Sequence, residues 1–228
     1  IINGEIGNNA IVKDIKLLSN YIVNDESILI NNGTITASSK NTFGNGIEMS
    51  LAIETGGREV NTFAEITVEI AEKIAKSRGD KNLLSEFKNF IDKYISLVTS
   101  SKGFIGKKAM IVNTLEVKDS FIGNSAKIIN ALRVSNSTVL SNDEEKTEIS
   151  NGALVSNSIL QWGSEATTMG IVESSVLTEH SHVERHGKVT NSLLGPNTGV
   201  AEGEVTACLL GPFVGFHHQA LLIAALWP

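Results

Sequence analysis

The sequence has few of the residues that cross-link or interrupt a chain. It contains one cysteine, Cys208, and three prolines among 228 residues, and aromatic residues make up only 5% of it. A single cysteine cannot form an internal disulfide, so stability must come from a packed core, which 41% hydrophobic content is enough to build. This cysteine usage predicts a reducing, cytoplasmic setting.

Basic residues are also scarce. The chain has 19 Lys and Arg against 25 Asp and Glu, for a formal net charge of −6, and no basic cluster that could follow a phosphate backbone. No apolar run approaches the roughly 18 residues of a membrane span. Neither nucleic acid nor a membrane is therefore an expected partner. Because the chain starts at Ile1 without a methionine and stops just after "ALLIAAL", we expect it to be a fragment of a longer chain.

Similar stretches recur along the second half of the sequence at nearly constant spacing. They are NSILQWG from Asn157, SSVLTEH from Ser174, NSLLGPN from Asn191 and ACLLGPF from Ala207, so that successive starting positions differ by 17, 17 and 16. Upstream, DSFIGNS and NSTVLSN start at Asp119 and Asn136, and the step from 136 to 157 becomes 17 if residues 143–146 form a loop. Self-similarity at this length predicts a solenoid.

A shorter period of six lies inside each repeat. Aliphatic residues keep it, and a small residue usually stands two positions before each of them; examples are Ile122, Ile128 and Val134, then Leu177, Val183 and Val189. Two inward side chains spaced by two describe a short strand, so a period of six gives three strands per turn. The pattern resembles the hexapeptide-repeat fold, a mainly β, left-handed parallel β-helix. A right-handed β-helix is the alternative, although its turns are usually longer and less even.

Residues 37–101 interrupt this pattern and divide the turns into two parts, 1–36 and 102–228. The stretch IEMSLAI alternates apolar and polar residues between turn signals, which predicts a β-hairpin arm. Beyond it, apolar residues recur at helical spacing and predict two amphipathic helices that pack as a pair against one face of the stack. The residues carrying this spacing are Ile66, Ile70 and Ile74, then Leu83, Phe87, Phe90 and Tyr94.

All five histidines lie between positions 180 and 218, and the repeat places them on one outward side of the stack. Arg185, Glu202 and His218 fall in one column on three successive turns, about 4.8 Å apart. A carboxylate beside an imidazole raises its basicity, so His218 with Glu202 is the preferred base and orienter. The alternates are His186 and His217, and the shortened repeat leaves the register between His217 and His218 uncertain by one residue. The competing interpretation is a solvated ladder of charges.

The residues around this column are expected to hold a substrate, since charged and amide groups there could bind anionic or hydroxyl groups. They are Arg185, Glu184, His180, His182, Glu204 and Gln219. A second candidate anion site is the TGGR turn, where Gly56, Gly57 and Arg58 could cradle a phosphate, with an ordinary hairpin turn as the alternative. No metal site is predicted: carbonic anhydrases of this fold carry two histidines five residues apart, a spacing that is absent here.

Five stretches carry a resemblance that spans nearly the whole chain. They are FGNG, ETGGREV, EHSHVERHGKV, GPNTGVAEGEVTACLLGPFVGFHHQALLIAALWP and the intervening helical pair. The chain resembles an uncharacterised bacterial family of left-handed β-helix proteins that carries a domain-of-unknown-function label. Its members are compared with sugar-nucleotide pyrophosphorylases and hexapeptide acyltransferases.

The resemblance implies a homotrimer with the histidine side near its interface, and it leaves the cofactor unknown. The function that follows is acyl transfer from a thioester to a sugar or sugar nucleotide, with a histidine as general base. A noncatalytic β-helix module that binds an anion or a partner is the alternative, and a zinc-dependent hydratase is the least favoured interpretation.

Overall fold

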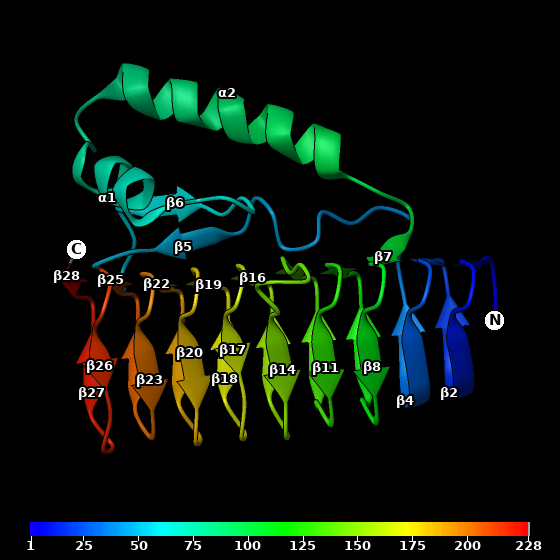
Figure 1. The fold of residues 1–228 in the computed structure, drawn as a ribbon. Coiled ribbons are helices and arrows are strands. Elements are labelled where there is room, and N and C mark those ends of the chain that lie inside the picture. The colour runs from blue at the N-terminus through cyan, green and yellow to red at the C-terminus, as the bar shows by residue number, and fades with distance from the viewer. Residues whose placement is uncertain (228) are drawn as a thin grey trace.

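The computed structural model describes residues 1–227, which are mainly β (Figure 1). Short strands pair in parallel with the strands one turn of chain away, so that successive turns lie side by side. The first sheet contains β1 (Glu5–Ile6), β3 (Tyr21–Val23), β7 (Gly103–Ile105), β10 (Phe121–Ile122), β13 (Thr138–Val139), β16 (Ile159–Leu160), β19 (Val176–Leu177), β22 (Leu193–Leu194), β25 (Leu209–Leu210) and β28 (Leu226–Trp227).

The second sheet has two arms that meet at the long strand β4 (Ile28–Thr36), which also pairs with β2 (Ile11–Ser19). The β8 arm contains β8 (Met110–Val112), β11 (Lys127–Ile129), β14 (Glu148–Ser150), β17 (Glu165–Ala166), β20 (His182–Glu184), β23 (Gly199–Ala201) and β26 (Gly215–Phe216). The β9 arm contains β9 (Glu116–Lys118), β12 (Arg133–Ser135), β15 (Leu154–Ser156), β18 (Ile171–Glu173), β21 (Lys188–Thr190), β24 (Glu204–Thr206) and β27 (Leu221–Ile223). The chain therefore visits the first sheet, the β8 arm and the β9 arm in each turn.

The strand register confirms the predicted repeat. Phe121 pairs with Thr138, and their numbers differ by 17. The difference is 21 between Thr138 and its partner Ile159, and 16 between Leu193 and its partner Leu209. The longer step is absorbed by residues 143–146, which lie outside the strands, as expected. Each turn thus repeats the side-chain directions of the previous one, and equivalent residues form columns along the stack.

The interior of the stack is a continuous core of such columns. One aliphatic column on the β8 arm passes through Ile128, Ile149, Val183 and Val200, all fully buried. A column of small residues on the first sheet is linked by hydrogen bonds: Ser158 Oγ accepts from Ser175 N at 3.1 Å, and the same contact repeats one turn on. The predicted inward pattern is therefore found in the described turns.

Tyr21 is the exception in the column of small residues. Its ring fills the space that Gly103, one turn away, leaves open, because a Cβ at residue 103 would lie 2.2 Å from the ring. The hydroxyl donates to the Ser120 carbonyl at 3.2 Å and accepts from the Ser120 amide at 3.1 Å. Burial raises the pKa of this phenol well above its ordinary value. A large side chain is thereby accommodated in a narrow interior without an unpaired polar group.

The segment between β4 and β7 forms a covering layer over the first sheet (Figure 1). It consists of the antiparallel pair β5 (Glu48–Ser50) and β6 (Glu59–Asn61), followed by α1 (Val68–Lys76) and α2 (Lys81–Val98). Thr67 caps α1 by accepting from Ile70 N, and Asp80 caps α2 by accepting from Leu83 N. The two expected helices are present.

The covering layer packs on the outward column of the first sheet, not on the second sheet. Ile159, Val176, Leu193 and Leu209 are fully buried under it, together with residues such as Met49, Ile66 and Ile74. The expected helical stripe is wrong at two positions, since Ile70 is 38% exposed and Phe90 is 45% exposed. Ile66 precedes the cap of α1, and the helix buries Val68, Ala71, Ile74 and Ala75 instead. The core of the protein therefore has two parts, one inside the stack and one beneath the layer.

Candidate functional site

One corner of each turn, between the β8 and β9 arms, holds residues with left-handed backbone geometry. In early turns this corner is occupied by asparagines, and Asn31, Asn113 and Asn130 form a ladder with side-chain hydrogen bonds of 2.8 and 3.0 Å. Asparagine adopts this backbone conformation more readily than other residues with a side chain. In the early turns, this corner therefore has a structural role.

The same corner changes chemistry in the later turns. Arg185, Glu202 and His218 occupy it with φ angles of 49°, 57° and 64°. The pairing of Val200 with Phe216 makes Glu202 and His218 equivalent, which resolves the one-residue ambiguity in favour of His218. Three ionisable residues thus take the place of asparagine at a corner whose left-handed conformation is less favourable for them.

The three side chains of this column do not form a continuous hydrogen-bonded chain. Arg185 NH2 lies 2.6 Å from Glu184 Oε1, so the guanidinium turns to its sequence neighbour. His218 Nδ1 lies 3.9 Å from Glu202 Oε2, and the His218 side chain is 92% exposed. A pair at this distance in water is screened and contributes little.

A hollow of about 400 Å³ lies beside the column and gathers four predicted site residues. His186, Glu202, Glu204 and Gln219 line it, together with Lys188, whose Nζ is 3.0 Å from Glu204 Oε1. Ile171, Ala220 and Leu221 supply apolar surface, and Gly203 completes the lining. Lys188 was missed by the sequence argument, although it stands one turn before Glu204 in the strand register. The hollow offers both hydrogen-bond donors and acceptors.

The closest contact between a histidine and a carboxylate lies at another corner. His180 Nε2 is 2.9 Å from Glu145 Oε2, and both side chains are about half exposed. Glu145 belongs to the loop of residues 143–146, and Gly163 leaves room for the pair, since a Cβ there would be 2.7 Å from the imidazole. In the sequence, this contact could have been suspected from the acidic residues of the loop 143–146, which was treated only as an interruption of the repeat.

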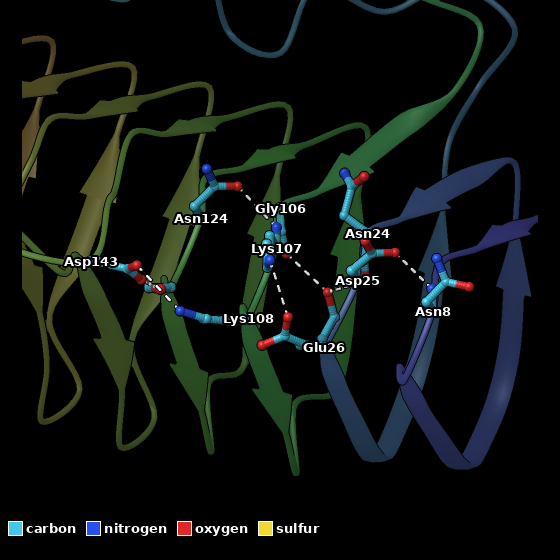
Figure 2. Close-up of polar contacts among 11 residues, drawn as sticks. Asn8, Asn24, Asp25, Glu26, Gly106, Lys107, Lys108, Asn124 and Asp143 are labelled. Atoms are coloured by element: carbon cyan, nitrogen blue, oxygen red, sulfur yellow. Dashed lines mark hydrogen bonds and ion pairs between the residues drawn. The ribbon is translucent and has the colours of Figure 1, made fainter.

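This second corner carries a ladder of charges in the N-terminal half as well (Figure 2). Lys107 Nζ lies 3.1 Å from Glu26 Oε1, and Lys108 Nζ lies 3.3 Å from Asp143 Oδ2. Beside them, the Asp25 and Asn124 side chains accept hydrogen bonds from the amides of Asn8 and Lys107. The charged side chains are exposed or nearly so, which is the geometry of a solvated ladder.

The remaining histidines lie apart from the hollow. His182 is on β20 and its imidazole covers Gly199 of the next turn, where a Cβ would lie 2.3 Å from Nε2. The ring centroids of His217 and His218 are 6.1 Å apart. Within residues 1–227, no three His, Cys, Asp or Glu side chains are grouped so that they could hold a metal ion.

The predicted anion site at the TGGR turn is occupied by the chain's own carboxylate. The Gly57 amide donates to Glu59, and Arg78 lies 2.9 Å from the other Glu59 oxygen. The amide hydrogen bond from Gly57 holds the pKa of Glu59 below its ordinary value. Arg58 is exposed and lies next to this turn. The turn therefore binds an anion in this structure, but an internal one.

Cys208 lies in the column of small residues, where its amide donates to Ser192 Oγ at 2.9 Å. Its Sγ donates to the Thr206 carbonyl at 3.1 Å and accepts from Ala225 N at 3.4 Å. Burial raises the pKa of the thiol, which keeps it protonated and unreactive. Cys208 therefore packs the core.

Parallel strands stacked turn by turn, with one covering layer and an ionisable corner, define this molecule as a repetitive parallel-β protein. Residues 1–228 match the family model described as Domain of unknown function (DUF4954), and the chain belongs to that family. No curated protein and no solved structure matches it. Among the residues that the structure describes, no helix is both long and apolar enough to cross a bilayer.

Proposed function

We propose that the stack is a left-handed parallel β-helix of the hexapeptide type. Three strands per turn support this interpretation, as do the inward columns of small and aliphatic residues. The register is also even, since paired positions in the later turns differ by 17 or 16. A right-handed β-helix usually has longer and less regular turns. Such a prism is rigid and presents its outward columns at fixed spacing.

We infer that the hollow binds a sugar or sugar nucleotide. The observation that carries this proposal is its mixed lining, in which Lys188 and Gln219 can donate while Glu202 and Glu204 accept. A sugar needs donors and acceptors around its hydroxyl groups, and its C–H face packs on apolar side chains such as Ile171 and Leu221. An anion alone would not account for two carboxylates in the lining.

The proposed reaction is acyl transfer to the bound sugar, with His186 as general base. His186 takes the proton of a sugar hydroxyl or amine while its oxygen or nitrogen adds to the carbonyl carbon of a thioester. The C–S bond then breaks, and the thiolate leaves and takes up a proton. Of the predicted bases, His186 is the one that shares the hollow with Glu202, Glu204 and Gln219.

The test is thiol release from acetyl-coenzyme A in the presence of glucosamine. We expect turnover by the parent and a loss of about 100-fold or more in His186→Asn, the range typical of a general base. His218→Asn is the matched control, because that side chain is 92% exposed and outside the hollow. Equal turnover in the parent and His186→Asn would remove the catalytic assignment.

Binding without turnover is the second candidate function. It is favoured by the openness of the site, where His186, Glu202 and Gln219 are all exposed. Saturable binding of UDP-N-acetylglucosamine that is weakened in Lys188→Met, with no thiol release, would identify a noncatalytic module. In either case we propose a cytoplasmic homotrimer in which the side with His180 and His182 faces a second copy.

A further inference from the structure

A second cavity, of about 340 Å³, lies beneath the covering layer at the opposite end of the stack from the histidines. Its floor is the outward column of the first sheet, where Ile22, Phe104 and Phe121 are register partners. The C-terminal half of α2 supplies Tyr94 and Val98 as its roof. Figure 1 shows α2 crossing above the sheet and descending into β7 at this point. The cavity therefore lies between the first sheet and the covering layer.

Aromatic side chains are concentrated around this cavity. The chain has 8 Phe, 2 Trp and 2 Tyr, and Phe43, Tyr94, Phe104 and Phe121 all line it. Phe104 and Phe121 stack at 4.8 Å with an interplanar angle of 4°, and Phe43 meets Phe121 edge-on at 6.1 Å. Farther along the same column the layer packs closely, and the column is fully buried from Ile159 to Leu209. At Phe104 and Phe121 the apolar surface stays half-buried and accessible.

The rim of the cavity carries one carboxylate without a cationic partner. Lys102 Nζ is 2.6 Å from Glu5 Oε1, so its charge is neutralised within the chain. Glu65 Oε2 accepts from the Tyr94 hydroxyl at 2.8 Å, and among residues 1–227 no Lys, Arg or His nitrogen lies within 4.0 Å of its carboxylate. Partial burial raises the pKa of Tyr94, which keeps its hydroxyl a donor. The uncompensated charge at the opening is negative.

We propose that this cavity binds a small aromatic amine, with the ring against Phe104 and Phe121 and the ammonium group at Glu65. Its volume lies in the range of about 300–1,000 Å³ that small-molecule sites occupy. An aromatic body matches the aromatic lining, because ring edges and faces attract one another. A cation is selected over an anion because Glu65 is the unpaired charge. This site shares no residue with the hollow proposed for the sugar.

The test uses tryptamine as the probe and indole-3-propionate as its anionic counterpart. Both are titrated into the protein while the ring resonances of Phe104 and Phe121 are followed by NMR. We expect saturable shifts of both rings with tryptamine at millimolar concentration, and binding of the anion weaker by about threefold or more, as a partly exposed charge pair allows. Absence of saturable shifts at these rings, or equal binding of the two probes, would overturn the proposal.

Two matched pairs of variants locate the site. Val98→Trp places a ring in the cavity and should abolish tryptamine binding, whereas Leu97→Trp adds the same ring at a neighbour that is 84% exposed and should leave it unchanged. Glu65→Gln should remove the preference for the cation, and Glu69→Gln, outside the cavity, should keep it. If Val98→Trp fails to fold, the shifts of the parent and the Glu65 pair still decide the matter.

Discussion

Inside the stack, a single residue is confined by its equivalents one turn before and one turn after. Val183 lies between Ala166 and Val200 in the β8 arm, and all three are buried and make no polar contact through their side chains. The side chains around such a position are apolar, so they offer neither a hydrogen-bond partner nor an opposite charge. An ionised side chain would keep its full desolvation cost.

Val183→Asp is therefore expected to destabilise the protein by more than about 3 kcal/mol, enough to remove most of the cooperativity of unfolding. The measurement is denaturant unfolding followed by circular dichroism. His182→Asp is the control, since this neighbour points outward on β20 and is only half-buried. It should cost less than about 1 kcal/mol. A Val183→Asp protein as stable as its parent would contradict the assignment of inward positions.

Residue positions were predictable from the sequence where backbone periodicity alone decides them. The repeat placed Arg185, Glu202 and His218 at equivalent corners, because a column is fixed by counting from paired strands. It did not place their side chains. A long side chain at an exposed corner can reach several nearby partners. Arg185 contacts its sequence neighbour Glu184, and His180 contacts Glu145, which belongs to an irregular loop. No periodicity describes such choices.

At the scale of elements, the covering layer is held on the stack by polar contacts as well as by apolar packing, and the buried Gln161 amide makes two of these contacts. Gln161 Nε2 donates to the Ala64 carbonyl at 2.9 Å and to the Ile66 carbonyl at 2.8 Å. Both carbonyls belong to the segment that leads into α1, just before its cap at Thr67. The amide thereby satisfies backbone groups that would otherwise be buried without partners.

Gln161→Ala should loosen the layer without melting the stack. Leaving two carbonyls unpaired costs about 1–3 kcal/mol for each group that stays dry. We expect faster amide exchange in β5, β6 and α1 while protection in β11 and β14 is unchanged, measured by hydrogen exchange. Ser156→Ala, which changes a half-buried residue of the β9 arm away from the layer, is the control. Uniform acceleration across both parts would show that they unfold as one unit.

The helices were predictable in number but less so in their buried faces. A spacing of four from Ile66 to Ile74 indicated one stripe, but a helix begins only after its cap, here Thr67. The small residues Ala71 and Ala75 lie against the sheet and permit close approach, so Ile70 is left at the surface. The spacing correctly placed Ile70 in a helix, but the direction of its side chain depended on tertiary packing.

For the whole molecule, the proposed homotrimer predicts a defined mass in solution. His180 is exposed at the corner before the β8 arm, and His182 points outward on that arm and is half-buried. A rigid flat side of this kind suits repeated self-association. We expect multi-angle light scattering to give three times the monomer mass at micromolar concentration. His180→Glu with His182→Glu should shift the population toward monomer, because six added carboxylates would meet at the threefold contact. A parent that is monomeric throughout would exclude this assembly.

The overall architecture could largely be predicted from the sequence, because in a repeat the spacing along the chain decides which residues lie side by side. Once Leu193 is known to pair with Leu209, the same rule places its neighbours in every column. The face of the stack that the layer covers could not be predicted in this way. Its only signal was the outward column containing Ile159 and Val176, whose apolar character needed something to bury it.

The placement of that layer also has a consequence for synthesis. Residues 37–101 leave the ribosome early, yet they cover strands as late as β25, whose Leu209 is made long after the end of this segment. At roughly 5–20 residues per second, translation takes roughly 5–20 s to supply that surface. During this interval Met49, Ile66 and Ile74 have no sheet to pack on. The nascent chain thus exposes these apolar side chains until the later strands of the first sheet have been made.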